Sequence, residues 1–341
     1  MGPEVTAAII AAGVGVPTVA ATVAVQISGR RATSRDTQKA LEEQHKQLDR
    51  TLAEQRTRTL NERFATAAGQ LGSDKPAVRL AGVYAMAGLP DDWEDNRQTC
   101  VDVLCAYLRM PYEADPGNEA PRPEQLAFRA IREVRHTVIR VITAHIQGGA
   151  AVSWKGLDFD FTGVVFDGGS FNDAEFSGGT VSFAGAVFSR STVYFDGAEF
   201  SGGTVYFTNA WFDGGGASFT RARFSGGRVL FEARFSGGTV DFSAAGFCGG
   251  TVDFSGAGFD SGVVDFSDAG FEGGTVSFTS AWFDGGVVDF TRARFSGSHV
   301  YFGNLKLLNG ARFSGGTLDF SSPGDWSVPP AFPWADTPPP A

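Results

Sequence analysis

The sequence is poor in the residues that bind metals or build disulfide frameworks. It has three cysteines, Cys100, Cys105 and Cys248, and four histidines that lie far apart. No CxxC pair occurs and the histidines form no ligand spacing, so nothing indicates a zinc site or a disulfide scaffold. We therefore expect three free thiols in a reducing compartment.

Motifs typical of catalysis are also missing. The 341 residues contain no nucleophile elbow, no phosphate-binding loop and no metal-ligand motif. The segment Gly249-Gly-Thr-Val-Asp253 lacks the second glycine of a calcium-binding nonapeptide repeat and places its aspartate one residue early. We expect a protein that is not an enzyme and uses no cofactor.

Positive charge is scarce relative to negative charge. The formal net charge is −10, with 28 Lys and Arg against 38 Asp and Glu. Contacts to phosphate groups need Lys and Arg, so an acidic chain is a poor general binder of nucleic acid. We therefore do not expect nucleic acid as a partner.

The N-terminal region contains a long stretch without charge, residues 5–27. As a helix it would span a hydrocarbon core of about 30 Å. A cleaved signal peptide would need a positive segment before the apolar run, but Glu4 stands there and positive charge follows at Arg30, Arg31 and Arg35. The pattern predicts a single-pass anchor over residues 1–29 in the cell membrane, with the C-terminal region in the cytoplasm.

A juxtamembrane stalk helix is predicted over residues 30–70. Strong helix formers dominate, and Leu41, Leu48 and Leu52 contribute to a thin apolar stripe among charged residues. A parallel coiled coil would need better filled a and d positions. Association of copies through the anchor or the stalk is left open.

Residues 71–150 read as a small helical domain. Ser73 is the expected N-cap of a helix that starts near Pro76, and two further helices are predicted over residues 95–108 and 124–146. The last of these should cover the start of the repeat region that begins at residue 151. Its arginines, which are either a solvated face or a surface for an anionic partner, are Arg129, Arg132, Arg135 and Arg140.

Phenylalanine dominates the second half of the chain at alternating steps of five and seven residues. The series begins Phe171, Phe176, Phe183, Phe188, Phe195, Phe200 and continues to Phe302 with one interruption. A repeated 12-residue unit with two apolar aromatics predicts a stacked solenoid. A β-meander with Gly-Gly hairpins is disfavoured, because alternation changes phase at Ser255-Gly256 within the unit.

The units resemble those of the pentapeptide-repeat proteins. Ala198-Glu-Phe200, Ala222-Arg-Phe224 and Ala257-Gly-Phe259 match the family pattern A-(D/N)-(L/F)-x-x, while the other half of each unit has Val in place of Ala, as in Val252-Asp-Phe254. Each pair of repeats also carries two extra residues. The resemblance covers residues 151–320 and implies a right-handed quadrilateral β-helix with the small and the bulky residue pointing inward.

A second resemblance concerns the helical region. Glu62-Arg-Phe-Ala and Arg79-Leu-Ala-Gly-Val-Tyr84 are similar to segments of the membrane-anchored pentapeptide-repeat proteins of actinobacteria. The expected fold is thus α+β and multi-domain: an anchor, a stalk, a helical cap, a β-solenoid over residues 151–322, and a Pro-rich irregular tail over residues 323–341.

Four sides per coil require two units, or about 24 residues, which gives about seven coils. The segment around Trp211 recurs around Trp282 after three coils, once one residue missing between Phe231 and Phe235 is restored. We therefore expect the two tryptophans to share one face of the solenoid.

Two sets of charged residues are candidates for an interaction surface. Asp241, Asp265 and Asp289 recur once per coil and should form an acidic stripe, which either binds a cation or a basic partner or is a solvated row. The second set recurs after three coils and consists of Arg221, Arg223, Arg292 and Arg294.

The expected function is a membrane-tethered scaffold that binds an unknown protein partner. Two alternatives stay open. One is a DNA-mimicking inhibitor of DNA gyrase or another topoisomerase, an activity that the family resemblance implies for some members. The other is a structural, self-assembling element.

Overall fold

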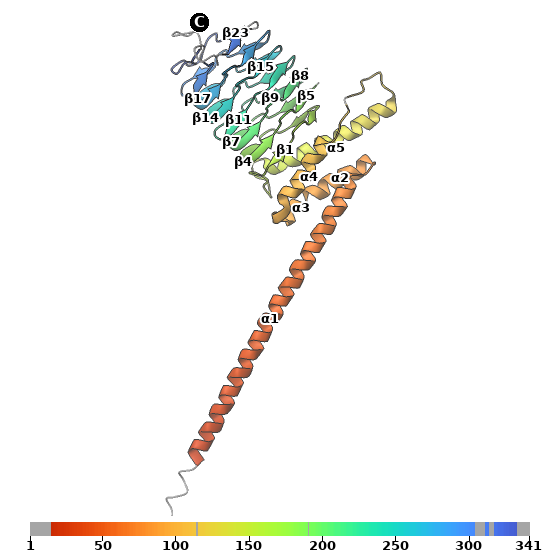
Figure 1. Cartoon of the computed structure of the whole chain (residues 1–341), viewed down its shortest axis with the longest axis vertical. Coiled ribbons are helices and arrows are strands. Elements are labelled where there is room, and N and C mark those ends of the chain that lie inside the picture. Colours follow the sequence, from red (N-terminus) through yellow and green to blue (C-terminus); the bar gives the residue numbers. More distant parts are fainter. Residues whose placement is uncertain (1–14, 114, 190, 304–310, 314–316, 333–341) are drawn as a thin grey trace, which may run out of the picture. The chain divides into compact units, whose positions relative to one another are not determined.

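The computed structural model describes the backbone of residues 15–113, 115–189, 191–303, 311–313 and 317–332, and their side chains from residue 37 onward except that of Phe313. The chain divides into two structural units, Met1–Glu62 and Arg63–Ala341. Helices make up the N-terminal region and short strands the C-terminal region, so the α+β class is confirmed (Figure 1).

The first unit contains most of helix α1 (Gly15–Leu71), and the expected stalk over residues 30–70 is helical throughout. Every side chain from residue 37 to residue 59 is exposed. The apolar stripe is included, since Leu41, Leu48 and Leu52 are each about half exposed. A helix that is polar on nearly all sides contributes little to a core of its own.

The transmembrane helix expected over residues 5–27 is not found in the described part of the chain. Residues 5–14 lie outside it, and residues 15–27 form the first part of the described helix α1. Among the residues that the structure describes, no helix has an apolar stretch long enough to cross a membrane.

A short turn joins α1 to α2 (Pro76–Ala87) in the second unit. The N–H groups of Gly72 and Ser73 donate to carbonyls of the last turn of α1, and Pro76 occupies the first turn of α2 as expected. Ser73 is not the N-cap, which corrects the prediction: Lys75 holds that position, and the Ser73 hydroxyl accepts a hydrogen bond of 3.2 Å from the Lys75 N–H.

The remaining helices build a small core next to the first strands. They are α3 (Leu89–Asp92), the 3₁₀ turn η1 (Glu94–Asn96), α4 (Arg97–Arg109) and α5 (Arg122–Ile146). Buried side chains include Val101 and Leu104 of α4 and Val138 and Ile142 of α5. The helices predicted over residues 95–108 and 124–146 therefore exist, with starts shifted by two residues.

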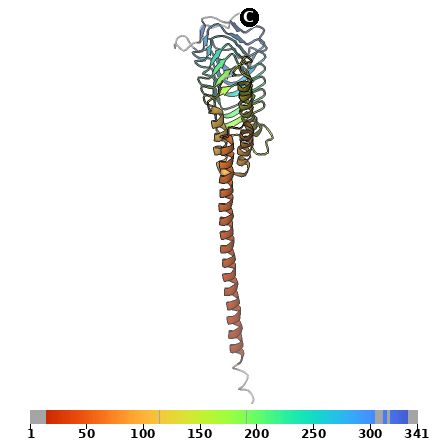
Figure 2. The same cartoon turned by 90° about the vertical axis from the view of Figure 1, so that its right-hand side faces the viewer.

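One coil of the solenoid consists of four short strands: β10 (Arg223–Phe224), β11 (Arg228–Leu230), β12 (Arg234–Ser236) and β13 (Thr239–Asp241). The first two lie in one sheet, because both pair with β7 and β14. All ladders between strands are parallel, so the hairpin alternative is excluded. Successive coils stack on one another (Figure 2).

The strands form three sheets. Sheet 1 contains β10, β11 and β1 (Phe159–Asp160), β4 (Glu175–Ser182), β7 (Glu199–Tyr206), β14 (Gly246–Asp253), β17 (Gly270–Ser277), β20 (Arg294–Phe295) and β21 (His299–Tyr301). Sheet 2 contains β12 and β2 (Val165–Phe166), β5 (Val187–Ser189), β8 (Trp211–Asp213), β15 (Gly258–Phe259), β18 (Trp282–Phe283) and β22 (Arg312–Phe313). Sheet 3 contains β13 and β3 (Gly169–Ser170), β6 (Thr192–Tyr194), β9 (Gly216–Ser218), β16 (Val263–Asp265), β19 (Val287–Asp289) and β23 (Thr317–Asp319).

The repeat length is confirmed and the coil number is corrected. Val240, Val264 and Val288 are register partners in successive strands of sheet 3, which gives the expected coil of about 24 residues. Within the described residues, seven strands in each of sheets 2 and 3 correspond to about six turns rather than about seven, because the first and last strands belong to incomplete coils. The right-handed winding stays a prediction.

The core is a set of stacked phenylalanine columns. Phe242 is fully buried, and its ring lies 4.8 Å from that of Phe219 and 4.9 Å from that of Phe266, nearly parallel to both. The rings of Phe231 and Phe254 meet it edge to face at 5.5 and 5.7 Å. Stacked and edge-to-face contacts are both favourable for aromatic rings, so the inward direction inferred from the repeat is confirmed.

The Gly-Gly pairs form bulges within strands. In β14 the register against β17 shifts between Phe247 and Thr251. Gly250 has a φ of +67°, and a Cβ at this position would lie 2.6 Å from the backbone carbon of Gly226 in the preceding coil. Both the left-handed backbone and the close approach of adjacent coils therefore require glycine here.

The tail is more ordered than expected. Asp325 and Ala331 form isolated parallel bridges with Arg294 and Tyr301, and the Phe332 ring stacks on Phe302 at 5.1 Å. The described part of the tail thus continues the stack at the end of the solenoid, where unpaired strand edges would otherwise be exposed.

Candidate interaction surfaces

The acidic stripe exists and runs along sheet 3. Asp241, Asp265, Asp289 and Asp319 are register partners in four successive strands, and each side chain is half-buried. The Oδ1 atom of each one accepts a hydrogen bond of 2.7 to 2.8 Å from the N–H two residues further on. This is the hydrogen bond of an Asx turn, so each carboxylate stabilises the corner that follows its strand.

Serine takes the same role one coil earlier. Ser218 is the register partner of Asp241, and the N–H of Thr220 donates to its hydroxyl at a longer 3.5 Å. Among the described residues, no group of three or more His, Cys, Asp or Glu side chains is placed to hold a metal ion. Local support of the corners therefore accounts for these aspartates, while binding of a cation or a basic partner by the stripe stays a prediction.

The four candidate arginines do not form one basic patch. Arg221 and Arg292 occupy the same left-handed corner position three coils apart, with φ of 58° and 59°. Arg292 donates two hydrogen bonds, of 2.9 and 2.6 Å, to the carboxylate of Asp268 in the coil before it. These bonds lower the pKa of Asp268 and raise that of Arg292.

The other two arginines project from sheet 1, again three coils apart. Arg223 pairs in register with Gly246, and Gly270 with Arg294. Arg294 also lies 3.8 Å from the carboxylate of Glu272. The spacing inferred from the sequence is confirmed for both pairs, but two of the four cations are already shared with acidic neighbours.

Sheet 2 carries a groove between two exposed tryptophans. Trp211 is 45% exposed and Trp282 is 52% exposed. They face outward from β8 and β18, with Arg234 and Gly258 at the equivalent positions of the two strands between them. The expectation that both tryptophans share one face is confirmed.

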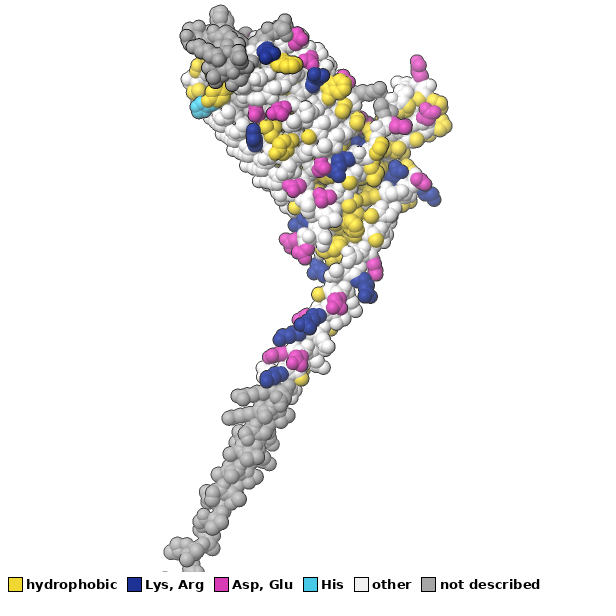
Figure 3. All heavy atoms as spheres, in the orientation of Figure 1, with side chains coloured by type: hydrophobic (Ala, Val, Ile, Leu, Met, Phe, Trp, Pro, Cys, Tyr) yellow, Lys and Arg dark blue, Asp and Glu magenta, His cyan; other side chains and the backbone are white. Residues whose placement is uncertain are grey.

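The groove has a volume of about 350 Å³. Its lining includes Gly256, where a Cβ would meet no atom within 4 Å, and Gly258, where a Cβ would lie 3.3 Å from the Asp260 carboxylate. The polar lining residues are Asn209, Glu232, Arg234 and Asp260. Arg234 lies 3.5 Å from the carboxylate of Asp260. On the face seen in Figure 3, hydrophobic, basic and acidic side chains occur as small separate groups on the solenoid.

Sequence reasoning placed the tryptophans correctly but did not recognise the groove. The available signal was the repetition of an outward-facing tryptophan on a regular scaffold, together with glycine at the equivalent position between them. Large aromatic side chains on a surface are uncommon and are enriched where proteins bind one another.

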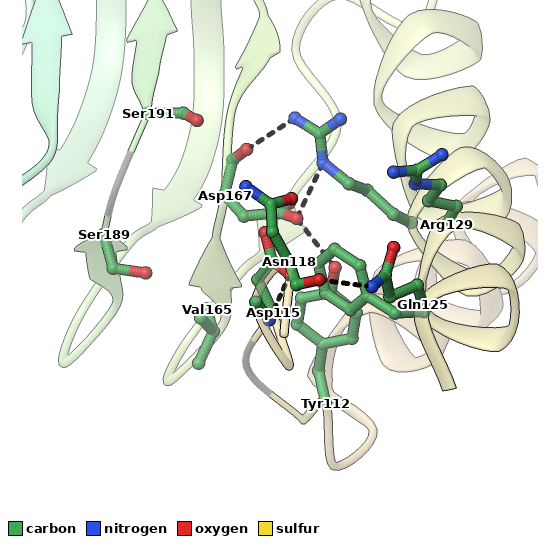
Figure 4. Close-up of a pocket in the computed structure, with 12 residues that line it drawn as sticks. Tyr112, Asp115, Asn118, Gln125, Arg129, Val165, Asp167, Ser189 and Ser191 are labelled. Carbon is green, nitrogen blue, oxygen red and sulfur yellow. Dashed lines mark hydrogen bonds and ion pairs between the residues drawn. The ribbon is translucent and has the colours of Figure 1, made fainter. Parts of the chain in front are cut away.

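A second pocket, of about 260 Å³, lies where α5 meets the start of the solenoid. Asp167, which follows β2, is one of the lining residues drawn in Figure 4. The Asp167 carboxylate accepts hydrogen bonds from the Tyr112 hydroxyl at 2.7 Å and Arg132 Nε at 2.9 Å, and its Oδ1 lies 3.1 Å from His136 Nε2. The network joins α5 and the loop before it to sheet 2.

The charges of this network explain two pKa shifts. Burial alone would raise the pKa of Asp167, but the hydrogen bonds from His136 and Tyr112 and the nearby cations outweigh it and lower the pKa to about 2. Burial and the adjacent Asp167 carboxylate raise the pKa of Tyr112 above its usual range. Asp167 is thus an ionised structural anchor.

The arginines of α5 have separate roles, which the sequence did not resolve. Arg135 is buried under the Tyr112 ring, 4.2 Å from its centroid, and donates hydrogen bonds to the carbonyls of Leu108 and Val165. Arg140 pairs with Glu133 at 2.8 Å in solvent, while Arg129 is exposed at the rim of the pocket. The helix expected to cover the first coil does so, with Arg132 and Arg135 attaching it.

Helix α4 contributes to the same junction. Its Arg109 donates to the Asp160 carbonyl of β1 at 2.9 Å, and Gln98 donates to the Asp158 carbonyl at 2.8 Å. Burial raises the pKa of its two thiols, to about 11 for Cys100 and about 12 for Cys105. All three cysteines are free, as expected.

The structure defines a class of protein, a parallel β-solenoid with a core of stacked phenylalanines. Residues 183–232, which lie within this solenoid, match the family described as pentapeptide repeats (9 copies). Over these residues the solenoid is therefore similar to pentapeptide-repeat proteins. Comparison with curated proteins and with solved structures gave no match.

Proposed function

We propose that this protein is a non-enzymatic, membrane-tethered scaffold that binds another protein through the outer face of sheet 2. The observation that carries the proposal is the pair of exposed tryptophans, Trp211 and Trp282, on either side of a groove. Burying a large apolar side chain contributes about 1.5–3 kcal/mol. A partner that covers both rings would gain much of this free energy, and tryptophan is enriched among the residues that dominate binding.

The scaffold beneath the groove supports the proposal. Phe212, Phe235, Phe259 and Phe283 lie one residue after the groove positions in each strand and are buried. Their rings stack at 4.7 to 5.0 Å. The tryptophans are thus held on a densely packed wall, and little ordering of the backbone is required when a partner binds.

The tether is proposed from the sequence. Residues 5–27 carry no charge, and Arg30, Arg31 and Arg35 follow them. Their order favours a single-pass anchor in the cell membrane with the solenoid in the cytoplasm. Association of copies through the anchor or the stalk helix is part of this proposal, as is the membrane-anchored, actinobacterial type of pentapeptide-repeat protein.

Site-specific crosslinking in membranes tests the partner. A photoreactive residue replaces Arg234 in the groove, and a second variant carries it at Val263, which is 38% exposed on sheet 3. We expect a discrete product from position 234 that disappears when Trp211 and Trp282 are both changed to Ala, and no product from position 263. Equal products from both positions would contradict a specific groove.

The identity of the product separates the alternatives. A gyrase subunit would support the DNA-mimicking inhibitor, and a product containing only this chain would support the self-assembling element.

Deletion of residues 5–27 tests the tether: the chain should move from the membrane to the soluble fraction, and retention in the membrane would refute the anchor.

A further inference from the structure

We infer that the groove on sheet 2 binds a basic, extended peptide segment whose Lys or Arg side chains lie against Trp211 and Trp282. The inference rests on the proposed function and specifies the chemistry of the partner. It follows from the spacing of the two strand positions that carry the tryptophans and from the charges around the groove.

The spacing determines how many side chains can engage. Trp211, Arg234, Gly258 and Trp282 stand in four successive strands of sheet 2. Adjacent strands are about 4.8 Å apart, so the two tryptophan positions are separated by about 14 Å. A cation must lie within about 6 Å of a ring to be attracted by it, so two cations spaced like the two strand positions can each engage one ring.

An extended peptide solves this geometry. It advances about 3.3 Å per residue, so side chains four residues apart span about 13 Å. Gly256, where a Cβ would meet no atom within 4 Å, leaves room for the peptide in the groove. Two basic residues at positions i and i+4 would then each face one indole.

The charges around the groove favour a cationic partner. The carboxylates are those of Glu232 and Asp260 at its edges and of Asp213 and Asp284, which follow the two tryptophans on the same outer face. Arg234 is the basic residue at the groove, and its nearest carboxylate is that of Asp260. Arg312 stands one strand beyond Trp282. Four carboxylates therefore stand against two guanidinium groups. This excess of negative charge attracts a cationic peptide and does not attract an acidic or a neutral one.

A labelled synthetic peptide tests this chemistry directly. The probe is a nine-residue Gly/Ser peptide with lysines four residues apart, and binding to the full-length chain in detergent is measured by fluorescence anisotropy. We expect Trp211→Ala and Trp282→Ala each to weaken binding about two- to fivefold, the effect of one exposed cation–π contact. Tyr194→Ala, which removes a 44% exposed aromatic from sheet 3, is the matched control and should change nothing.

Three further measurements distinguish charge from apolar contact. Acetylation of both lysines should abolish binding, raising salt from about 20 to 200 mM should weaken it, and Glu232→Gln should weaken it and reduce that salt dependence. Equal binding of the acetylated peptide, tighter binding of a neutral Pro-rich peptide, or equal loss in Tyr194→Ala would overturn the inference.

The two proposals fail separately. If the groove crosslinks a partner in membranes while the lysine peptide shows no preference over its acetylated form, the scaffold function stands and the basic partner is wrong. If the peptide binds at the tryptophans but position 234 yields no crosslinked partner, the chemistry of the groove stands and the scaffold function is wrong.

Discussion

The acidic stripe of sheet 3 can be tested at its middle member, Asp265. Asp265 lies between Asp241 and Asp289, and its Oδ1 accepts a hydrogen bond of 2.7 Å from the Ser267 N–H. The substitution Asp265→Ala removes both the acceptor and the charge. Asp265→Ser removes the charge but keeps an acceptor, as Ser218 does naturally in the same column.

The hydrogen bond and the repulsion between neighbouring carboxylates contribute to the free energy of unfolding with opposite signs and similar sizes. A hydrogen bond to a charged acceptor contributes about 1.5–3 kcal/mol, and a neutral one about 0.5–1.5 kcal/mol. Repulsion between carboxylates about 5 Å apart in water is about 0.8 kcal/mol per neighbour. Two neighbours and screening at about 0.15 M salt leave about 1 kcal/mol of repulsion at Asp265.

The free energy of unfolding, measured in urea by far-UV circular dichroism, reports the balance. We expect Asp265→Ala to lose about 1–2 kcal/mol, since the lost hydrogen bond exceeds the relieved repulsion. Asp265→Ser should stay within about 0.5 kcal/mol of the wild-type chain, because relief of repulsion offsets the weaker acceptor. If both variants lose the same stability, the corner hydrogen bond does not explain the stripe.

Three other predictions concern the core, the bulges and the cap. Phe254→Ala should lower the free energy of unfolding by about 3–5 kcal/mol, against less than about 1 kcal/mol for the exposed Tyr206→Ala; similar losses would contradict the stacked core. Gly250→Ala places a Cβ 2.6 Å from backbone and should lower the free energy of unfolding by about 2–5 kcal/mol. Gly256→Ala has an open Cβ position at a φ of +71°, so it should lower the free energy of unfolding only by the backbone strain of about 1–2 kcal/mol. Equal losses would show that adjacent coils do not approach closely. Because the pKa of Asp167 is about 2 in the folded chain and 3.8 ordinarily, its network stabilises the fold fully above about pH 5 and loses about 2 kcal/mol by pH 2. Urea unfolding of Asp167→Asn should lack this pH-dependent loss, and an unchanged profile would remove Asp167 as its source.

The solenoid could be predicted in detail because its repeat leaves few alternatives. The alternating phenylalanine steps specify which residues point inward, and parallel stacking then places every residue beside its counterpart one coil away. The shared faces of Trp211 with Trp282 and of Arg221 with Arg292 follow from counting alone. The bulges at the Gly-Gly pairs needed the structure, because a glycine pair is compatible with both a hairpin and a strand bulge.

The helical cap was predicted only in outline. Helix positions followed from apolar spacing and from Pro76, but the partners of the α5 arginines did not. Arg135 reaches the carbonyls of Leu108 and Val165. Contacts over such sequence separations depend on how α5 packs against the first coil, which no local pattern encodes.

The phenylalanine rhythm, together with the change of alternation phase at Ser255-Gly256, was sufficient to predict a stacked solenoid, because apolar side chains spaced this regularly can be buried together in such a stack. Folding in three dimensions decided the rest. The structure shows that the aspartates of the stripe support the corners, and that a buried arginine and an ionised aspartate attach the cap. It also shows a groove lined by two glycines and two tryptophans. These features depend on which side chains meet across different coils and elements, and that proximity arises only when the chain is folded.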